Sequence, residues 1–556
     1  MNLNPLIKKL LQKRGIDTEE EMEEFLSDKP RKTYDPFLLP DMEAGVDLIL
    51  SEARSGSKIC VYGDYDADGI TATALMLTML SHLTSAENLS YYIPSRFEEG
   101  YGLNMEAIDH IADLGCDLII TVDCGSVSSG EVEHAKALGM KIIVTDHHNI
   151  TDTMAECIVI NPKRPDSVYP FRDLAGCGVA FKVAQALQKK GGLQRHVLTE
   201  VLDLVAIGTI GDIMPLLDEN RTMVKFGLRV LNLGSRPGLK KLIDGTSLQP
   251  GRISSGNVSF VIVPHLNASG RIEDASQAVE LLLGRKDEAE LDRIVEDILQ
   301  KNIQRKRLQS ELFDRLRRMV NKDDPGDFII LEADGSHEGI AGIVAGKIKD
   351  TFYRPTVIVS PTGDGEKLLK GTGRSIEGVN LYDVLKSQER LFVKFGGHGG
   401  ACGFSMEKSA LPELKKGVAA MMKELRERDD DIFRRKYDTD LDLEVGDLSM
   451  DLADQLELLA PFGNKNPRPL IRCEDVEITS VRYMGEEGKH VRFCAEDGSG
   501  GQIWCVLFNK AEDYACELSG EWPVSLVGRL ECQEWQGVKR LQFLVDQIEI
   551  DESLRQ

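Results

Sequence analysis

Four short apolar runs, separated by helix-length segments, dominate the pattern of the chain between residues 45 and 165. The runs cover residues 59–62, 118–122, 142–145 and 158–160. Strands that are apolar along their whole length and alternate with helices are typical of a parallel sheet covered on both faces. This segment therefore predicts a parallel α/β sheet, which is the strongest constraint that the sequence places on the fold.

The rest of the chain divides around this segment. At 556 residues, the chain is long enough for three or four domains. The pattern predicts a helical N-terminal cap (1–44), a first α/β domain (45–284), a linking helix (285–325), a glycine-rich second α/β domain (326–436) and a small antiparallel barrel (437–556). We therefore expect a multidomain protein of the α/β class with a C-terminal β-barrel.

The overall charge of the chain is strongly acidic. The 67 lysines and arginines face 91 acidic residues, which gives a formal charge of -24. At long range this charge repels nucleic acids and anionic membranes, so an anionic substrate must be captured by local basic groups. No apolar stretch reaches about 18 residues and the N-terminal segment lacks a signal-peptide pattern, so we expect a cytoplasmic protein without a membrane partner. The 11 cysteines are odd in number and include no C-x-x-C, which favours reduced thiols.

Clusters of acidic and histidine side chains follow the predicted strands and one apolar helix. Ligands of open α/β sheets bind at the carboxyl ends of the strands, so these positions indicate a site. In chain order, the clusters are Asp64, Asp66 and Asp68 after the first run, Asp123 after the second, Asp146, His147 and His148 after the third, and Asp212 after the helix 201–207. Converging carboxylates repel one another unless cations neutralise them. Carboxylates with imidazoles and no thiolate suit Mn²⁺ or Mg²⁺.

Each cluster taken alone has a simpler explanation. An aspartate after a strand commonly caps the following helix, and a pair of histidines is commonly packed or exposed on the surface. Their occurrence together within about 150 residues favours a common site. Nucleoside triphosphate is not the obvious ligand, because residues 342–347 lack the spacing of a Walker A loop and Gly397-His398-Gly399 does not complete a G-x-G-x-x-G motif.

The order of the motifs resembles the DHH phosphoesterase superfamily. The motifs are DYDADG (64–69), VDCG (122–125), DHH (146–148) and GDIMPL (211–216). The later motifs GTGRS (371–375) and GGHGGACGF (396–404) resemble the DHH-associated domain of that superfamily. Three further segments, PSRFEEGYGL (94–103), PHLNASGR (264–271) and PFGNKNPRP (461–469), are similar to the RecJ family of single-strand-specific exonucleases.

The resemblance implies a fold and a set of site residues. The two α/β domains would be a DHH domain and a DHH-associated domain, and the barrel would be an OB-fold. Two Mn²⁺ or Mg²⁺ ions per active site would be bound by Asp64, Asp66, Asp68, Asp123, His147 and Asp212. The implied catalytic residues are Asp66, Asp68, Asp123, His147, His148 and Asp212. The implied substrate-binding residues are Arg96, Tyr101, Asn267, Arg271, Thr372, Arg374 and His398. Of these, Arg96, Thr372 and Arg374 would hold a terminal 5′-phosphate, and Tyr101 would stack on a base.

The barrel carries aromatic residues interleaved with basic ones, as a single-strand-binding OB-fold does. The aromatic residues are Tyr483, Phe493, Trp504, Phe508 and Trp535, and we expect about half of them to belong to the barrel core. The sequence alone does not separate base contacts from core residues here.

The function that the resemblance implies is 5′→3′ hydrolysis of single-stranded DNA to 5′-mononucleotides by two-metal catalysis, in DNA recombination and repair. Single-stranded DNA would be the main partner of a monomeric enzyme, and a single-strand-binding protein and a helicase are candidate partners. One alternative is a DHH-family phosphodiesterase acting on nano-RNA or cyclic dinucleotides, which would not need the linking helix or residues 437–556. A second alternative is a non-catalytic replication scaffold, which the intact set of acidic residues disfavours.

Overall fold

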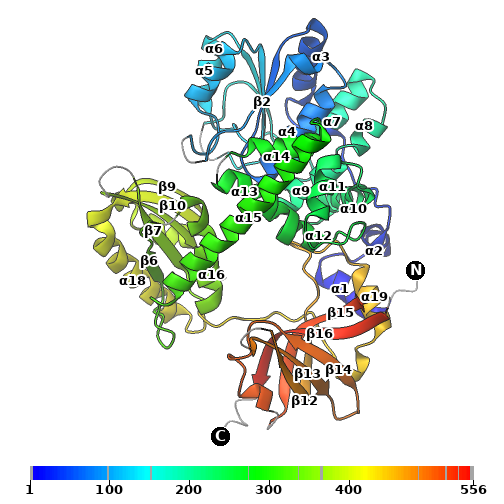
Figure 1. The fold of residues 1–556 in the computed structure, drawn as a ribbon, viewed down its shortest axis with the longest axis vertical. Coiled ribbons are helices and arrows are strands. Elements are labelled where there is room, and N and C mark those ends of the chain that lie inside the picture. The colour runs from blue at the N-terminus through cyan, green and yellow to red at the C-terminus, as the bar shows by residue number, and fades with distance from the viewer. Residues whose placement is uncertain are drawn as a thin grey trace.

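The computed structural model describes residues 4–550, except residues 97–98, 151–152, 273, 336, 363–366, 486–487, 520–521 and 536–537. Figure 1 shows three lobes: a first α/β lobe at the top, a second α/β lobe at the left and a barrel at the bottom. A single long helix, α15 (Glu288–Arg317), connects the first two lobes. Among the described residues, no helix is both long enough and apolar enough to cross a membrane.

A five-stranded parallel sheet forms the centre of the first lobe, with the strand order β2-β1-β3-β4-β5. Its strands are β1 (Ile59–Tyr62), β2 (Leu89–Tyr92), β3 (Leu118–Val122), β4 (Lys141–Thr145) and β5 (Ile158–Ile160). The chain leaves β1 toward one edge and returns beside it as β3, so the strand order reverses between these two strands. In sheets of this order, the crevice at the reversal is the usual ligand site.

Helices cover both faces of this sheet. One face packs against α3 (Met42–Ser55), α4 (Ala67–Leu80) and α7 (Gly176–Gly191), and the other against α5 (Met105–Asp113) and α6 (Ser129–Ala137). The remaining helices of the lobe are α8 (His196–Thr199), α9 (Leu202–Gly211), α10 (Asp218–Leu233), α11 (Pro237–Asp244), α12 (Ser255–Asn257), the π-helix η3 (Val258–Ile262), α13 (Val263–Ile272) and α14 (Ser276–Leu283). Helix α9 is almost entirely apolar and buried, so its C-terminal end brings Asp212 to the sheet.

The second lobe is built on a mixed sheet with the strand order β6-β7-β8-β10-β9. Its strands are β6 (Ile329–Glu332), β7 (Thr356–Thr362), β8 (Leu368–Arg374), β9 (Phe392–His398) and β10 (Ala401–Glu407). Only β6 and β7 pair in parallel, and the other neighbours are antiparallel. Helix α16 (Glu338–Phe352) packs with α15 on one side, and α17 (Leu381–Lys386) and α18 (Leu411–Arg428) enclose the other core.

The barrel is a six-stranded sheet with the order β11-β12-β13-β14-β16-β15, closed because β12 also pairs with β15. Its elements are β11 (Leu441–Asp442), α19 (Met450–Glu457), β12 (Ile471–Met484), β13 (His490–Glu496), β14 (Gln502–Leu507), β15 (Val524–Trp535) and β16 (Val538–Ile550). Short 3₁₀ turns are η1 (Pro36–Leu38), η2 (Ala86–Asn88), η4 (Glu389–Leu391), η5 (Lys408–Ala410), η6 (Val445–Asp447) and η8 (Glu517–Ser519). The predicted fold class, two α/β domains with a linking helix and a C-terminal barrel, is confirmed. The barrel is not purely antiparallel as predicted, because β11 pairs with β12 and β14 with β16 in parallel.

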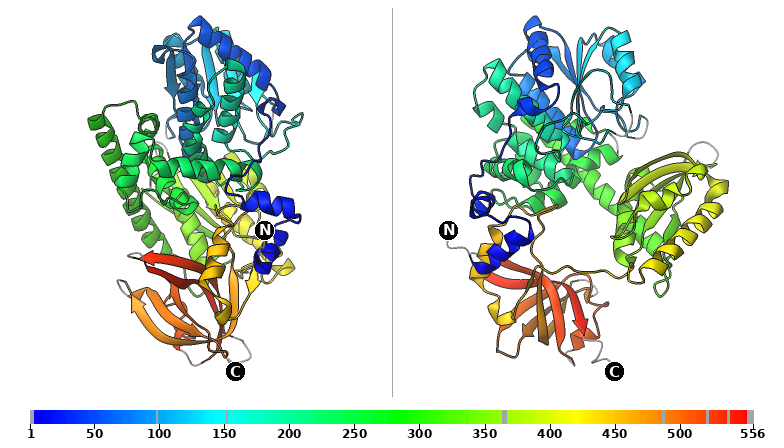
Figure 2. Two further views of the ribbon diagram at one scale, coloured as in Figure 1. Left: turned by 90° about the vertical axis from the view of Figure 1, so that its right-hand side faces the viewer. Right: turned by 180° about the vertical axis from the view of Figure 1, so that it is seen from behind.

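The first two helices, α1 (Pro5–Lys13) and α2 (Glu19–Leu26), pack on the barrel, as the view from behind in Figure 2 shows. Ile7, Leu10 and Leu11 are fully buried in one cluster with the apolar residues of the barrel strands. At the end of α1, the Lys13 ammonium donates to two carbonyls just before β11. The N-terminal helices therefore complete the core of the C-terminal barrel, although they precede it by more than four hundred residues in the chain.

We predict that Leu10→Ala destabilises the barrel by about 2–5 kcal/mol, because truncating a fully buried leucine removes its contacts and leaves a cavity. Hydrogen exchange followed by mass spectrometry should show faster exchange in β15 and β16 and unchanged exchange in β1–β5. Lys9→Ala, on the exposed side of the same helix, is the matched control. Equal exchange in the two variants would contradict a shared core.

Candidate metal centre and substrate cleft

The turn between β1 and α4 places three aspartates at the end of the first strand. Asp66 is the N-cap of α4, and its Oδ1 accepts from the backbone N–H groups of Asp68 and Gly69 at 2.9 and 3.2 Å. Residue 69 must be glycine for this turn to close, because a Cβ atom there would lie 2.5 Å from the carbonyl oxygen of Asp64. Asp64 and Asp68 are both buried as a result, 3% and 1% exposed.

The start of helix α7 lies against the ends of β1 and β3. Its first N–H groups, from Gly176 and Cys177, donate to the two carboxylate oxygens of Asp68 at 2.6 and 2.9 Å. A helix N-terminus favours negative charge, so this contact fixes the Asp68 carboxylate and offsets part of the burial that raises the pKa of Asp68. Asp123 follows β3 with a left-handed φ of 65°, and a Cβ atom at residue 176 would lie 2.6 Å from its Oδ1. Glycine at 176 therefore makes room for this carboxylate.

Asp146, the first residue of the DHH motif, orients the two histidines that follow. Its Oδ1 accepts from His148 Nδ1 at 2.8 Å and from the backbone N–H of His147 at 2.7 Å, and its Oδ2 accepts from the N–H of Ser126 at 3.0 Å. Burial alone would raise the pKa of Asp146, but the hydrogen bond and charge of His148 hold it well below its usual value. The sequence placed Asp146 in this polar cluster but assigned it neither a metal-binding nor a catalytic role. The signal for its role is its buried position directly after β4.

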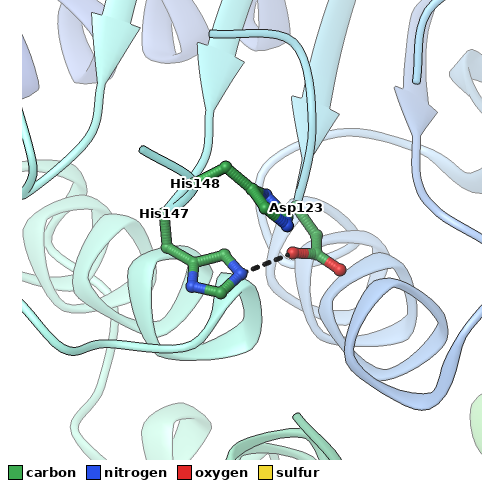
Figure 3. Close-up of side chains that lie close together, drawn as sticks. All are labelled: Asp123, His147 and His148. Atoms are coloured by element: carbon green, nitrogen blue, oxygen red, sulfur yellow. Dashed lines mark ion pairs between the residues drawn. The ribbon is translucent and has the colours of Figure 1, made fainter. Parts of the chain in front are cut away.

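His147 faces Asp123, and an ion pair joins the two side chains (Figure 3). Its Nε2 is 3.1 Å from Asp123 Oδ1, 3.5 Å from Asp212 Oδ2 and 3.9 Å from Asp68 Oδ2. Asp212 does not follow a strand but is the C-cap of helix α9. Residues from β3, β4, α4 and α9 thus converge on one imidazole, as the sequence analysis predicted for these clusters.

Several atoms of this cluster that could bind a metal ion have no hydrogen-bond partner among the described residues. Asp64 Oδ1, Asp123 Oδ1, Asp212 Oδ2 and both ring nitrogens of His147 are buried and accept or donate no hydrogen bond among the described residues. Buried polar atoms in native proteins almost always have partners, so unpaired ones need a bound ion or water. The atoms are carboxylate oxygens and an imidazole nitrogen, which are ligands for Mn²⁺ or Mg²⁺. The residues present therefore fit a divalent metal centre.

The pKa values of the cluster agree with this interpretation. Burial and the charge of Asp66 raise the pKa of Asp64 to about 8, and burial with the charge of Asp68 raises that of Asp212 to about 8. Burial and the neighbouring aspartates raise the pKa of Asp123 well above its usual value. Burial lowers the pKa of His147 to about 4, so its ring is neutral and able to bind a metal ion above that pH. The raised pKa values thus show that no nearby cationic side chain fully neutralises these carboxylates.

Three overlapping groups of side chains could each hold an ion. In each group, the potential ligand atoms lie within 4.8 Å of one another. The groups are Asp64, Asp66 and Asp123; Asp68, His147 and Asp212; and Asp123, His147 and His148. Because Asp123 and His147 each belong to two groups, neighbouring ions could share them. The six predicted metal ligands and His148 all fall within these groups.

A cavity of about 970 Å³ lies between the first lobe and the second, next to this cluster. Tyr65 and Tyr101 line it on the metal side, and Tyr101 places its hydroxyl 3.0 Å from His148 Nδ1. Among the described residues that line the cavity, the charged ones are all basic: Arg96, Arg271, Lys370, Arg374 and Lys394. The cavity is therefore suited to an anionic ligand that extends away from the acidic cluster.

The arginines of this cavity come from both lobes. Arg96 lies over the ring of Tyr65 at 5.0 Å, and Arg271 donates to the carbonyl of Gly339 across the lobe boundary at 2.9 Å. Arg374 lies beside Thr372 on β8. Burial and the charge of Arg96 lower the pKa of Arg271 to about 10 and also lower that of Arg374. Mutually repelling buried cations of this kind are typical of a site that binds an anion.

Five of the seven predicted substrate-binding residues line this cavity: Arg96, Tyr101, Arg271, Thr372 and Arg374. The other two do not. Asn267 is half-buried on α13, one turn before Arg271, and its Oδ1 has no hydrogen-bond partner among the described residues. His398 lies exposed at the end of β9, where its Nδ1 accepts from the N–H of Gly400 at 3.2 Å.

The barrel separates its aromatic residues into core and surface. Phe493 is fully buried, whereas Tyr483, Trp504 and Phe508 are exposed. On the outer face of β13 and β14, Arg492 lies over the ring of Trp504 at 4.3 Å, and His490 contacts Phe508 edge-on. The side chain of Trp535 lies outside the described residues. An exposed aromatic and basic surface of this kind can stack on unpaired bases.

Comparison with protein families divides the chain into three matched regions. Residues 58–209 match the DHH family, N-terminal domain, residues 326–424 match the DHHA1 domain, and residues 439–547 match the RecJ OB domain. These regions contain the parallel sheet, the second-lobe sheet and the closed barrel, respectively.

Individual relatives resemble the chain over almost its full length. It is 37% identical to the single-stranded-DNA-specific exonuclease RecJ of Bacillus subtilis, covering 99% of this chain and 69% of that protein. It is 34% identical to the RecJ exonuclease of Salmonella typhimurium, covering 98% and 96%. The crystal structure of RecJ from Thermus thermophilus in complex with Mn²⁺ superposes with a TM-score of 0.83 at 28% identity, covering 99% of this chain and 76% of that one. The same protein in complex with Mg²⁺ gives 0.76 at 27%.

We predict that metal binding releases protons and that the metal-free protein loses stability as the pH rises toward about 8. Folding raises the pKa of Asp64 and Asp212 from 3.8 to about 8, so the folded chain binds their protons more tightly than the unfolded chain does. The stabilisation by those protons is present at low pH and is lost as the pH passes through the folded pKa.

Calorimetric titration of Mn²⁺ in two buffers of different ionisation enthalpy measures the released protons. Thermal melting of the EDTA-treated protein at about pH 6 and about pH 8 measures the stability. Asp212→Asn should release fewer protons than the wild type. Binding heats that are independent of the buffer would contradict the assignment.

Proposed function

This chain belongs to the RecJ family of single-stranded-DNA-specific exonucleases, and from that premise we propose how its own residues perform the reaction. The enzyme hydrolyses single-stranded DNA in the 5′→3′ direction to 5′-mononucleotides and uses Mn²⁺ or Mg²⁺. The observation that supports the residue assignment best is the cavity in which arginines of both lobes lie beside buried carboxylates without partners.

We assign the metal ligands to the cluster around His147. The set is Asp64, Asp66, Asp68, Asp123, His147 and Asp212. When bound, two divalent ions supply neutralisation of the scissile phosphate and an acidified water for in-line attack. The helix α7 N-terminus and the glycines at 69 and 176 hold these carboxylates at fixed positions, so little rearrangement is needed when the ions bind.

His148 is suited to a proton-handling role. Burial opposes a charge on its ring, but the hydrogen bond to Asp146 raises the pKa of His148 above its usual value. Because Asp146 accepts from Nδ1, the other donor of a protonated His148 is Nε2–H, which lies 3.3 Å from the Tyr101 hydroxyl. We propose that His148 donates this hydrogen to a phosphate oxygen or to the leaving oxygen, and that Asp146 fixes the ring in that orientation.

We propose that the arginines of the cavity set the polarity of degradation. Arg96 and Arg374, with Thr372, would bind the terminal 5′-phosphate, since planar guanidinium groups match phosphate oxygens. A strand anchored there presents its next phosphodiester to the acidic cluster, so one nucleotide is released per event. Arg271 would steady the strand between the lobes, and Tyr101 would contact the first base. Asn267 and His398 would contact the strand farther from the terminal phosphate.

The barrel would hold the following nucleotides on its exposed aromatic surface. This division favours a long single strand over the nano-RNA or cyclic dinucleotide substrates of the alternative. We further propose that the enzyme acts as a monomer in the cytoplasm, in recombination and repair. A helicase and a single-strand-binding protein are the partners that would supply its strand. A retained set of metal ligands also disfavours a purely non-catalytic scaffold.

We predict that Arg96→Ala reduces hydrolysis about ten- to a hundredfold more on a 5′-phosphorylated strand than on a 5′-hydroxyl strand. A hydrogen bond to a charged group contributes about 1.5–3 kcal/mol, and its partner is present only in the first substrate. Initial rates on two end-labelled strands of one sequence measure the preference. Arg96→Lys keeps the charge and loses the planar fork, so its preference for the 5′-phosphorylated strand should lie between that of the wild type and that of Arg96→Ala. An equal slowing on both strands would show a general backbone contact.

We predict that Trp504→Ala weakens binding of a long single strand by about tenfold and leaves cleavage of a tetranucleotide nearly unchanged. Stacking on one base contributes about 1–3 kcal/mol, and no barrel residue lines the cavity in which we expect a tetranucleotide to bind. Fluorescence anisotropy and initial rates measure the two effects. If the variant loses the same factor on both substrates, the aromatic surface is not a separate binding region.

A further inference from the structure

Helix α9 ends in an unfavourable backbone conformation directly beside the metal centre. Asp212 is its C-cap, and Ile213 follows with a left-handed φ of 57°. The N–H groups of Ile213 and Met214 donate to the carbonyls of Ile210 and Thr209 at 3.2 and 3.1 Å. This is a Schellman turn, in which the left-handed position is usually glycine. A β-branched residue is strained there and stays there only when its surroundings hold it.

The contacts that hold this turn come from the PFGNKNPRP segment (461–469), which lies between α19 and β12 of the barrel. Asn464 donates from Nδ2 to the carbonyl oxygen of Ile213 at 2.7 Å, and its own carbonyl accepts from the N–H of Leu216 at 2.9 Å. The segment also fits closely, because a Cβ atom at Gly463 would lie 2.7 Å from Leu216. Asn464 thus bonds to both sides of the turn that begins with Asp212.

The segment is itself fixed to the first lobe and to the N-terminal helix. The Ser255 hydroxyl donates to the carbonyl of Phe462 at 2.6 Å. Asn466 is fully buried, donates to the carbonyls of Leu459 and Pro461, and accepts from the Arg14 guanidinium at 2.7 Å. Asn464 therefore projects from a firmly held loop and not from a loose linker.

The carboxylate of Asp212 depends on this turn for its direction. Its Oδ2 lies 3.5 Å from His147 Nε2 and has no hydrogen-bond partner among the described residues. Two of the other carboxylates accept from backbone N–H groups: Asp66 from Asp68 and Gly69, and Asp68 from Gly176 and Cys177. For Asp212, the orientation comes from the backbone at positions 212 and 213.

We propose that Asn464 is a positioning residue for Asp212: it holds the strained Ile213 turn and so sets one ligand of the metal centre. The proposal rests on the proposed function, in which Asp212 binds metal. It makes the segment that leads into the barrel a part of the active site, in addition to the role of the barrel in holding the strand.

The first test is the variant Asn464→Ala. It should lower Mn²⁺ affinity by about fivefold to tenfold, the equivalent of one net hydrogen bond. Electron paramagnetic resonance of free Mn²⁺ measures this affinity without any substrate. At limiting Mn²⁺, kcat on a tetranucleotide should fall by a similar factor while KM changes little. Lys465→Ala, in the same loop with the contacts of Asn464 intact, is the matched control and should keep wild-type Mn²⁺ affinity.

The second test combines Asn464→Ala with Ile213→Gly. Glycine adopts a left-handed φ without strain, so a turn with glycine in place of Ile213 no longer needs the hydrogen bonds of Asn464. The double variant should therefore bind Mn²⁺ as Ile213→Gly alone does. If Asn464→Ala lowers affinity equally in both backgrounds, or leaves it unchanged in the wild type, the positioning role is refuted.

Asp212→Asn separates this proposal from the proposed function. Loss of Mn²⁺ affinity in Asp212→Asn together with wild-type affinity in Asn464→Ala would refute only the positioning role. Wild-type affinity in Asp212→Asn would refute the assignment of Asp212 itself. Thermal melting of each variant shows whether the fold is intact.

Discussion

Repulsion among buried carboxylates around His147 is the constraint on which the rest of the structure depends. Asp64, Asp68 and Asp123 are almost fully buried, and burial together with the charges of neighbouring aspartates raises the pKa of each. The fold tolerates this because the N-terminus of α7 donates to Asp68, the turn at 64–69 fixes Asp66, and glycine at 176 makes room for Asp123. The strand reversal between β1 and β3 supplies the crevice in which they meet.

The distribution of charge over the two lobes allows an acidic protein to bind an acidic polymer. The carboxylates are confined to the first lobe, where cations can neutralise them, and the adjoining cavity is lined by arginines and lysines. Helix α15 helps to fix the two lobes relative to each other, since Lys301, Asn302 and Arg305 in its middle are buried against neighbouring helices. Binding is therefore local, in spite of the net charge of -24.

Much of this arrangement could be predicted from the sequence, for identifiable reasons. The buried strands β1, β3, β4 and β5 are apolar runs, and the residues after them mark the site. Strand β2 was not predicted because Leu89–Tyr92 is a half-buried edge strand with no distinctive pattern. The apolar faces of α1 and α2 predicted helices but not what covers them, since amphipathic periodicity does not name a partner. The contact between Asn464 and Ile213 spans 251 residues and leaves no local signal.

The shared core of α1, α2 and the barrel has a consequence for biosynthesis. Ribosomes add about 5–20 residues per second, so the helices emerge well before the strands that will cover Ile7, Leu10 and Leu11. During that interval, roughly half a minute to two minutes, an apolar surface on the nascent chain has no native partner. Chaperones would recognise this surface. It would become buried only after the last strands of the barrel had been synthesised. Incomplete chains would keep it exposed and be open to proteolysis.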